Sequence, residues 1–416
     1  MLHKIKVHIK ESSLILISFL RWFVLASISG AVVGLVISLF LNCLQFATNT
    51  RKSNPWLLYL LPLGGALVSY LYAKFGRDSA KGNNLIIERI NEGQGHIPFR
   101  MAPLVFFGTF ITHLFGGSAG REGTGVQIGA SISAKIGRIL KLKGLDYTIL
   151  IISGVSSGFG VVFGTPIAGT VFGLEVSSIG KMRYEAIIPC FVSSYIGNFI
   201  AKLLNVHHSH YNVVDVIGGV DVFFKVILCA ALFGLTSKLF AELTHELKKF
   251  FSKKIPNSTL KSFIGGIIII IIVLILGTRI YLGLSLDLLS DSFTTVVSKD
   301  SFIIKLVLTS LTLAVGFQGG EVTPLFVIGA TLGNLLAGIV GLPISFLAGM
   351  GMIAVFAGAT KTPISSFIMG IELFGSSNIE YLFIVCAISY VFAGRSTIYT
   401  SQKNSLFKPD EEDIYT

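Results

Sequence analysis

The chain has 416 residues, of which 52% are hydrophobic and only 13% charged, and its mean hydropathy is +0.77. No soluble core needs so much apolar sequence, so the composition predicts a polytopic helical membrane protein. The apolar segments are long and do not alternate, which excludes a β-barrel porin. The formal net charge of +11 comes from Lys and Arg in the N-terminus and a few loops, a pattern that indicates membrane orientation rather than nucleic-acid binding.

Two apolar spans precede a short polar segment. Residues 14–46 are too long for a signal peptide and lack a cleavage site, so they predict a retained, tilted first helix. Residues 56–75 predict a second span. Gly82, Asn83 and Asn84 then precede an apolar triplet, which is typical of the capped start of a short helix. An ordinary surface helix is the other interpretation of this segment.

The chain is organised around a glycine-dense run, residues 116–130. Apolar sequence lies on both sides of it, so one helix is expected to end and another to begin there. Such a break leaves backbone N–H groups unpaired at the positive end of a helix dipole, where they attract anions. The run contains Arg121 and Glu122. We expect Glu122 to occupy the anion site or, when protonated, to vacate it.

The histidines and cysteines of the chain offer only weak signals for a cofactor. His207, His208 and His210 lie in a polar loop without a nearby acidic or cysteine partner, which favours solvated side chains over a metal site. The four cysteines lie in apolar runs at unrelated spacings and indicate neither a metal set nor a disulfide framework. We predict no metal, ATP or redox cofactor.

Internal repeats divide the chain into two homologous halves. Thr-Pro-Ile followed by Gly-Leu-Glu, at residues 165–175, recurs as Thr-Pro-Ile followed by Gly-Ile-Glu, at residues 362–372. Gly-Arg-Glu followed by Ile-Gly-Ala, at residues 120–130, recurs as Gly-Gly-Glu followed by Ile-Gly-Ala, at residues 319–330. Repeats with broken helices are typical of transporters whose substrate site lies where the halves meet. We predict one membrane domain and no large soluble domain, divided into residues 1–206 (first half), 207–220 (loop), 221–402 (second half) and 403–416 (polar tail).

The acidic residues of the two helix breaks carry the expected chemistry. Glu122 and Glu321 begin apolar helices, where an ionised carboxylate costs about 2.5–3.5 kcal/mol at the bilayer centre unless dipoles or water stabilise it. That cost favours titration, and protonation of either acid would couple to the movement of an anion. Thr323 and Asn83 offer neutral donors to a small, strongly hydrated anion. A buried salt bridge to Arg121 is the structural alternative. Glu175 and Glu372, at matched repeat positions, are instead expected to be structural hydrogen-bonding residues.

These motifs resemble the CLC family of chloride channels and anion/proton antiporters over essentially the whole membrane region. The resemblance rests on Gly-Arg-Glu-Gly-Thr at 120–124, Gly-Gly-Glu-Val-Thr-Pro at 319–324, the Thr-Pro segment at 160–175, and Tyr399. Three departures are similar to the fluoride branch, whose members are fluoride/proton antiporters that export fluoride from bacteria. They are Thr124 in place of proline, Glu-Val-Thr-Pro at 321–324, and Lys-Gly-Asn-Asn at 81–84 in place of Gly-Ser-Gly-Ile-Pro.

The resemblance implies an all-α, inverted-repeat homodimer in the cell inner (plasma) membrane, with one pore per subunit. It implies that Glu122 is the gating glutamate, that Glu321 and Thr323 are the branch-specific pair, and that Tyr399 lines the inner pore. Asn83 occupies the position of a coordinating serine in the wider family and of a methionine in some of the fluoride branch. Glu122 and Glu321 are thereby the expected gating and proton-transfer residues, and the expected anion-binding residues are Asn83, Gly120, Arg121, Gly123, Val322, Thr323 and Tyr399.

The sequence favours one transport function and leaves alternatives open. Proton-coupled chloride exchangers of the family carry a second glutamate where this chain has Val176, and channels lack it too, but Glu321 offers a replacement acid that a channel would not need. We therefore expect a proton-coupled fluoride antiporter, with a chloride or broad-anion channel or a chloride/proton exchanger as the alternative. The Gly-x-Ser-x-Gly match at 116–120 makes an intramembrane serine hydrolase the remote alternative, although no strand precedes Ser118.

Overall fold

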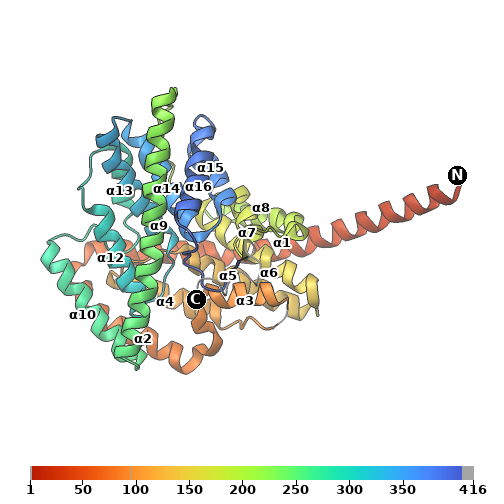
Figure 1. Cartoon of the computed structure of the whole chain (residues 1–416). Helices are drawn as coiled ribbons and strands as arrows, with labels where there is room; N and C mark the ends of the chain where they lie inside the picture. Colours follow the sequence, from red (N-terminus) through yellow and green to blue (C-terminus); the bar gives the residue numbers. More distant parts are fainter. Residues whose placement is uncertain (1, 94, 405–416) are drawn as a thin grey trace, which may run out of the picture.

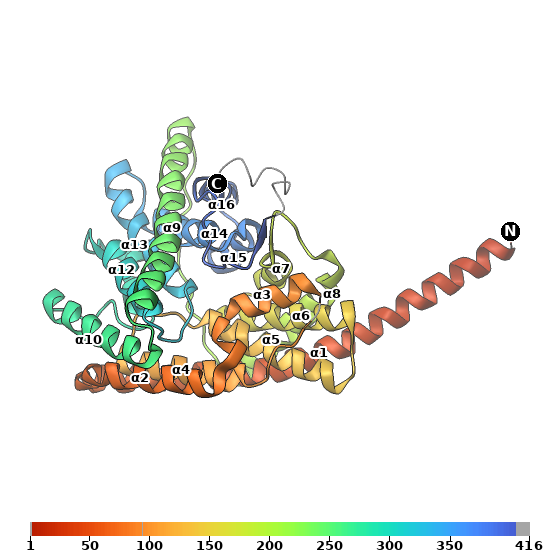
Figure 2. The same ribbon diagram turned by 60° about the horizontal axis from the view of Figure 1, so that its bottom comes forward.

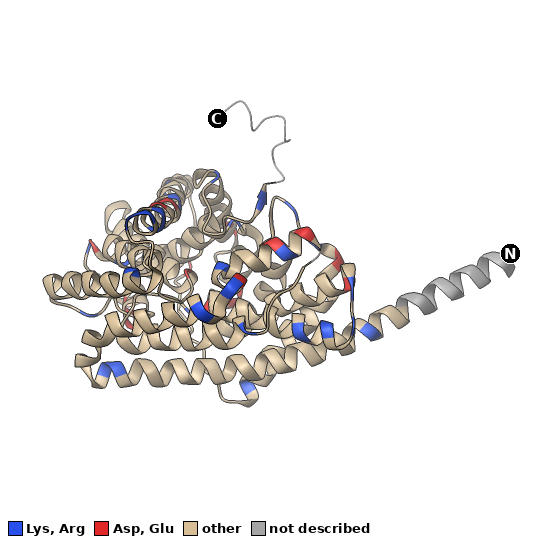
Figure 3. Cartoon of the chain, turned by 90° about the horizontal axis from the view of Figure 1, so that it is seen from below, with Lys and Arg blue, Asp and Glu red and all other residues tan. Residues whose placement is uncertain are grey.

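The computed structural model describes residues 2–93 and 95–404. The predicted tail therefore lies outside the described residues from residue 405 onward. Most of the described chain is helical, and Figure 1 shows it as a compact helical body from which the first helix projects. Seven described helical segments are long and apolar enough to span a membrane. Figure 3, which views the molecule from below, shows the described Lys and Arg residues scattered over several helices and loops.

The described residues of the first half form eight α-helices. Its long first helix is continuous and ends with Arg51 and Lys52 in its last turn. It extends further at both ends than the predicted residues 14–46. The α-helices are α1 (Leu2–Ser53), α2 (Leu61–Leu71), α3 (Asn83–Glu92), α4 (Met101–Phe115), α5 (Glu122–Ile139), α6 (Gly144–Phe163), α7 (Pro166–Glu175) and α8 (Ile187–Leu203). Short 3-10 or π turns at η1 (Pro55–Leu60), η2 (Tyr72–Gly76), η3 (Arg77–Lys81) and η4 (Tyr184–Ala186) connect some of them.

The second half repeats this set of eight helices. They are α9 (Val220–Lys254), α10 (Ser258–Leu276), α11 (Leu286–Thr294), α12 (Ser301–Ala314), α13 (Val322–Val340), α14 (Ile344–Thr360), α15 (Pro363–Phe374) and α16 (Ile379–Phe392). Two short parallel strands, β1 (Ser178–Ile179) and β2 (Lys403–Asn404), tie the end of the described chain to the turn after α7.

Matched helices of the two halves pack against one another, as an approximate twofold axis requires. Within each half the first helix packs on the last, α1 on α8 and α9 on α16, and the broken helix packs on its successor, α5 on α6 and α13 on α14. Between the halves α2 packs on α10 and α7 on α15. Figure 2 shows α2 and α10 side by side, with α7 next to α15. The predicted repeat is therefore a structural repeat.

Positive backbone φ angles mark the points where helices break. Gly116 (φ 91°) follows α4 directly, and Gly316 (φ 102°), 200 residues later, is the second residue after α12. Both conformations are strained for a residue with a β-carbon. This spacing corrects the sequence alignment of the two acids by one residue. Glu122 is the first residue of α5, whereas Glu321 is the residue that precedes α13, whose first residue is Val322.

The short helix predicted near Asn83 is present as α3, but its start is formed differently. Gly82, with φ 59°, precedes the helix, and no side chain caps it. Asn84 instead accepts a hydrogen bond from the backbone N–H of Ser401 at 3.1 Å, and the Ser401 hydroxyl donates to Glu88 at 3.2 Å. The C-terminal segment is thereby fixed against α3, which brings Tyr399 to the side of the molecule that carries Asn83.

Candidate anion and proton site

The starts of α5 and α13 meet at a small antiparallel bridge. The N–H of Gly120 donates to the carbonyl oxygen of Gly320 at 2.6 Å, and the N–H of Gly320 donates to that of Gly120 at 2.8 Å. The approach needs glycine, since a β-carbon on Gly320 would lie 2.7 Å from the backbone nitrogen of Gly123. The bridge therefore places two positive helix ends at one point, where they favour a negative charge.

The carboxylate of Glu122 fills this point. Its side chain is fully buried, and its Oε2 accepts from the backbone N–H of Arg121 at 3.0 Å and from that of Thr323 at 3.0 Å. The Thr323 hydroxyl donates to Oε1. Hydrogen bonds to a charged group contribute about 1.5–3 kcal/mol each, so three donors offset much of the cost of burying this carboxylate. Two of the three come from the opposite repeat.

The predicted ion pair between Arg121 and Glu122 is present but long. The Nε of Arg121 lies 3.8 Å from Oε1 of Glu122, beyond hydrogen-bonding distance, and this Nε has no partner among the described residues. The backbone donors therefore hold Glu122 more directly than the guanidinium does. The salt-bridge alternative accounts for only part of the environment of this acid.

Glu321 has a different environment. Its Oε2 is buried and has no hydrogen-bond partner among the described residues, and the same is true of Oδ1 of Asn83. A β-carbon placed on Gly123 would lie 2.8 Å from Nδ2 of Asn83 and 3.5 Å from Oε2 of Glu321. The glycine thus lets both polar groups approach the first turn of α5. An unpartnered buried carboxylate oxygen is costly, which marks this position for a functional role.

Tyr399 and Asn83 line a very small internal cavity. Its volume is about 10 Å³, and the other walls are apolar side chains of α3, α5, α6 and α7. A space of about 10–15 Å³ holds one water molecule. The cavity therefore accommodates a single small ion or water between the predicted inner-pore tyrosine and the predicted anion-binding amide. Val176, which also lines it, stands where the resemblance expects an acid in chloride exchangers.

The remaining predicted residues are placed as follows. Gly120 and Gly123 supply close backbone approach on the α5 side, and the buried Val322 opens α13. Thr124, one of the departures from the family pattern, shares a hydrogen bond of 2.7 Å between its hydroxyl and that of Thr109 in α4. The structure therefore brings Glu122, Thr323, Glu321 and Asn83 around one helix start, with Tyr399 beyond them.

Glu175 and Glu372 cap each other's repeat. The Glu175 carboxylate accepts from the backbone N–H groups of Ile364 (3.1 Å) and Ser365 (2.8 Å) at the start of α15. The Glu372 carboxylate accepts from those of Ile167 (3.0 Å) and Ala168 (2.7 Å) at the start of α7. Two helix N-termini are satisfied in this way across the approximate twofold axis. The expected structural role of both acids is confirmed by these bonds.

Comparisons with known proteins agree with this geometry. The family model described as voltage gated chloride channel matches residues 64–394. The chain belongs to this family. It is 40% identical to the "Chloride/fluoride channel protein" of Pseudomonas syringae pv. tomato over 92% of this chain and 86% of that protein.

Two solved structures extend the comparison. A CLC-type fluoride/proton antiporter matches with a TM-score of 0.90 and 36% identity, over 92% of this chain and 98% of that one. A slow cyanobacterial Cl⁻/H⁺ antiporter, at 23% identity, matches with a TM-score of 0.79 over 91% of this chain and 96% of that one and shows the shared fold. The chain is therefore a multi-pass membrane protein with the CLC fold, as the sequence predicts.

The CLC chain contains buried cations that the sequence analysis missed. Lys305 of α12 is fully buried, and its Nζ donates to the carbonyl oxygens of Tyr281 (3.1 Å) and Gly283 (2.8 Å) and to the hydroxyl of Ser285 (2.9 Å). Arg51, at the end of α1, packs against Gly283. A lysine within an apolar helix was the available signal, because such residues are rare unless they have a partner or a function.

The structure corrects the prediction for one histidine of the 207–210 loop. His208 is partly buried rather than fully solvated, since its Nε2 lies 2.9 Å from the carbonyl oxygen of Val161.

His113, the nearest base for a hydrolase, directs Nδ1 to the carbonyl of Thr109 (2.8 Å) and Nε2 to that of Ala119 (3.1 Å). The Ser118 hydroxyl pairs with Thr309 at 2.9 Å. No base therefore contacts Ser118 within the described residues, and this geometry opposes the serine hydrolase alternative.

Proposed function

We propose that this CLC chain is a proton-coupled antiporter that exports fluoride from the cytoplasm. The observation that carries the proposal is the pair of donors that Thr323 directs at the buried carboxylate of Glu122. A carboxylate oxygen that accepts from these donors stands in for an anion at the meeting point of two helix starts. The 36% identical structure of a CLC-type fluoride/proton antiporter supports the same assignment.

Protonation of Glu122 would open the site. A neutral carboxylic acid is a weaker acceptor than a carboxylate, so proton uptake weakens its hold on the three donors. Fluoride then takes the place of the carboxylate, and the N–H and O–H groups of Thr323 replace part of its hydration shell. Release of the proton restores the charge of Glu122 and expels the anion. Because either the Glu122 carboxylate or fluoride, but not both, can occupy the site, the proton flux and the fluoride flux are coupled.

Glu321 and Asn83 serve the inner half of this cycle. The unpartnered Oε2 of Glu321 lies near the first turn of α5, where it can accept a proton or face a fluoride ion that leaves the outer position. Asn83 Nδ2 offers a neutral donor on the same side. The cavity of about 10 Å³ between Asn83 and Tyr399 then holds the small ion on its way to the inner opening.

The assembly completes the proposal. We propose a homodimer with one independent pore in each subunit, embedded in the cell inner membrane, with fluoride and protons as the transported ions. No enzymatic step and no cofactor enters the cycle. Light scattering of the detergent-solubilised protein, corrected for bound detergent, measures the oligomeric state, and a monomer would contradict this part of the proposal.

Proton flux in liposomes tests the function. An outward fluoride gradient should drive uphill proton uptake into liposomes that contain the protein, and an equal chloride gradient should not. Fluoride movement without proton movement would indicate a channel, in line with the name of the Pseudomonas relative. Proton uptake driven equally by chloride would indicate a chloride/proton exchanger.

A further inference from the structure

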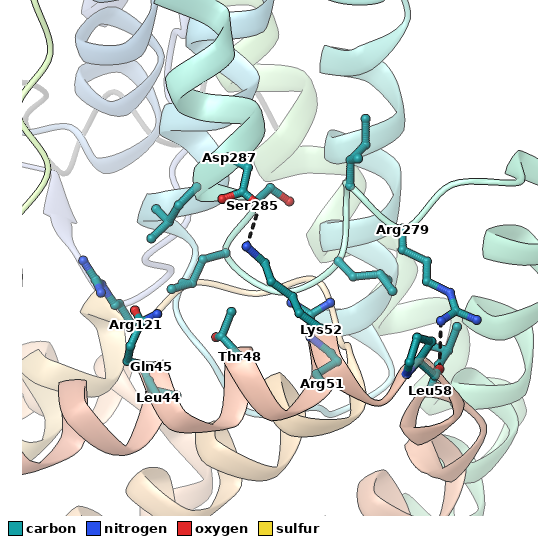
Figure 4. Close-up of a pocket in the computed structure, with 15 residues that line it drawn as sticks. Leu44, Gln45, Thr48, Arg51, Lys52, Leu58, Arg121, Arg279, Ser285 and Asp287 are labelled. Atoms are coloured by element: carbon teal, nitrogen blue, oxygen red, sulfur yellow. Dashed lines mark hydrogen bonds and ion pairs between the residues drawn. The ribbon is translucent and has the colours of Figure 1, made fainter.

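A wide cavity lies between the end of α1 and the loop that precedes α11. Its volume is about 480 Å³ (Figure 4). Four basic side chains and one acidic side chain line it, together with neutral residues; the charged ones are Arg51, Lys52, Arg121, Arg279 and Asp287. Figure 4 shows these side chains coming from the end of α1, from the residue before α5, from the loop before α11 and from the first turn of α11. The cavity thus carries an excess of positive charge.

Asp287 is the only acid on the cavity wall, and outside the wall Arg121 has the Glu122 carboxylate 3.8 Å from its Nε. Asp287 pairs with Lys52 at 2.6 Å. Arg279 donates to the carbonyl oxygen of Pro55 at 2.9 Å, a neutral group. The Nε atoms of Arg51 and Arg121 are buried and have no hydrogen-bond partner among the described residues. Buried donors of a charged group are costly when unpaired, so this wall of the cavity is suited to an anionic ligand.

The cavity leads toward the site of Glu122. Arg121 and Leu286 line it, and they also line a second, narrower space of about 30 Å³. Thr323, which donates to Glu122, is on the wall of that narrower space. Arg121 therefore stands where the access route narrows from about 480 Å³ to about 30 Å³.

The chemistry of the wall selects the ligand class. The planar fork of arginine matches the paired oxygens of an oxyanion, whereas a monatomic ion such as fluoride uses only one point of it. The wide cavity also exceeds the needs of a single halide ion. We propose that it binds a polyatomic oxyanion of the phosphate or sulfate class, which stops at Arg121 and obstructs fluoride passage. The binding site stands independently of transport, and only the obstruction rests on the proposed function.

Titration of the purified protein tests the binding. Inorganic phosphate and, separately, sulfate are titrated calorimetrically into the detergent-solubilised protein. Arg51→Gln and Arg279→Gln are each expected to weaken binding about tenfold, the effect of losing one charge-assisted hydrogen bond. Lys74→Gln removes an exposed cation outside the cavity and should leave it unchanged. No binding to the native chain, or binding that neither arginine variant weakens, would overturn the proposal.

Two of the variants guard against a trivial result. Arg51 is partly buried and its replacement could disturb the fold, but Arg279 is exposed in the loop and its loss leaves the packing of α1 intact. Normal thermal unfolding of Arg279→Gln together with weakened phosphate binding supports the site. If Arg51→Gln is unfolded, Arg279→Gln decides the test alone. Normal thermal unfolding of Arg279→Gln with unchanged phosphate binding would then refute the site.

A lipid phosphate could supply the same chemistry as a free oxyanion. Phosphate binding is therefore measured again in nanodiscs of phosphatidylcholine alone and of phosphatidylcholine with phosphatidic acid. Loss of phosphate binding only with phosphatidic acid assigns the cavity to a lipid headgroup. Equal binding in both assigns it to a soluble oxyanion. Either result supports the oxyanion site, and absence of binding in both overturns it.

Measurements of fluoride flux distinguish failure of this inference from failure of the proposed function. Phosphate on the side to which the cavity opens should slow fluoride flux in proteoliposomes, and Arg279→Gln should relieve the inhibition. Phosphate binding in a protein that moves no fluoride would leave the site intact and refute the proposed function. Normal fluoride/proton exchange without phosphate binding would refute the inference alone.

Discussion

The two helix starts at the centre of the molecule are built alike but carry their acids differently. Glu122 is the first residue of α5, and Glu321 precedes the first residue of α13. One residue of a helix corresponds to a rotation of about 100°. Glu122 accordingly meets the donors of Thr323, whereas Oε2 of Glu321 meets none among the described residues. A one-residue difference between the repeats thus gives the Glu122 carboxylate three hydrogen-bond donors and leaves Oε2 of Glu321 with none among the described residues.

Replacement of Glu122 should have the largest effect on proton-coupled transport. Glu122→Gln keeps the size of the side chain but removes the titratable group, so fluoride-driven proton flux should fall by at least about 100-fold, the lower range for loss of a positioned acid–base group. Proton flux in liposomes under a fluoride gradient measures it. Glu380→Gln, at an acid in the first turn of α16, is the matched control and should keep the native flux. Native proton coupling in Glu122→Gln would remove Glu122 from the mechanism.

Replacement of Glu321 should give a smaller loss. Glu321→Gln leaves the donors on Glu122 in place, so fluoride should still bind while proton flux falls about tenfold, corresponding to about 1.4 kcal/mol in the barrier. The ratio of fluoride flux to proton flux is the measurement. If both variants reduced the two fluxes in the same proportion, the division of roles between the acids would be wrong.

Replacement of Thr323 tests the donor that crosses the repeats. Thr323→Val removes the hydroxyl and keeps the shape and the backbone N–H, so fluoride affinity should fall about tenfold, as for one hydrogen bond to a charged group. Calorimetric fluoride titration of the Glu122→Gln background isolates this contribution. Thr331→Val, at a hydroxyl that bonds within α13, serves as control. An unchanged affinity after loss of the Thr323 hydroxyl would contradict its assigned contact with the anion.

Glu175 and Glu372, which each accept hydrogen bonds from a helix start of the other repeat, should affect stability rather than transport. Glu175→Gln and Glu372→Gln each weaken two hydrogen bonds at a helix start, with an expected loss of about 0.5–2 kcal/mol, the range for a helix cap. Thermal unfolding in detergent measures it, and the ratio of fluoride to proton flux should stay native below the unfolding temperature. A changed ratio in Glu175→Gln with native stability would mean that this acid carries protons.

Sequence patterns predicted the repeat and the glycine-broken helices, because both depend on local periodicity and on residues with positive φ. They also placed Glu122 at a helix start. They misaligned the two acids by one residue, since Gly-Arg-Glu and Gly-Gly-Glu match as letters but differ in where the helix begins. The offset is also present in the sequence, because the shared Ile-Gly-Ala begins six residues after Glu122 and seven after Glu321, and Gly116 and Gly316 confirm it.

Contacts between distant segments could not be predicted from the sequence. The bonds from Thr323 to Glu122 join residues 201 positions apart, and Lys305 finds its acceptors in a loop about 20 residues away. His208 was expected in water because its neighbours are polar, yet the loop turns it toward Val161. Such contacts depend on tertiary packing and produce no periodic pattern in the sequence.

The central claim is that the Glu122 carboxylate and fluoride compete for the donors of Thr323. Fluoride binding as a function of pH, measured calorimetrically on the native chain and on Glu122→Gln, tests it most directly. Native affinity should rise as the pH falls, because protonation frees the donors, and the variant should bind fluoride more tightly near neutral pH, with a flatter pH dependence. An identical pH dependence of the two proteins would contradict the competition.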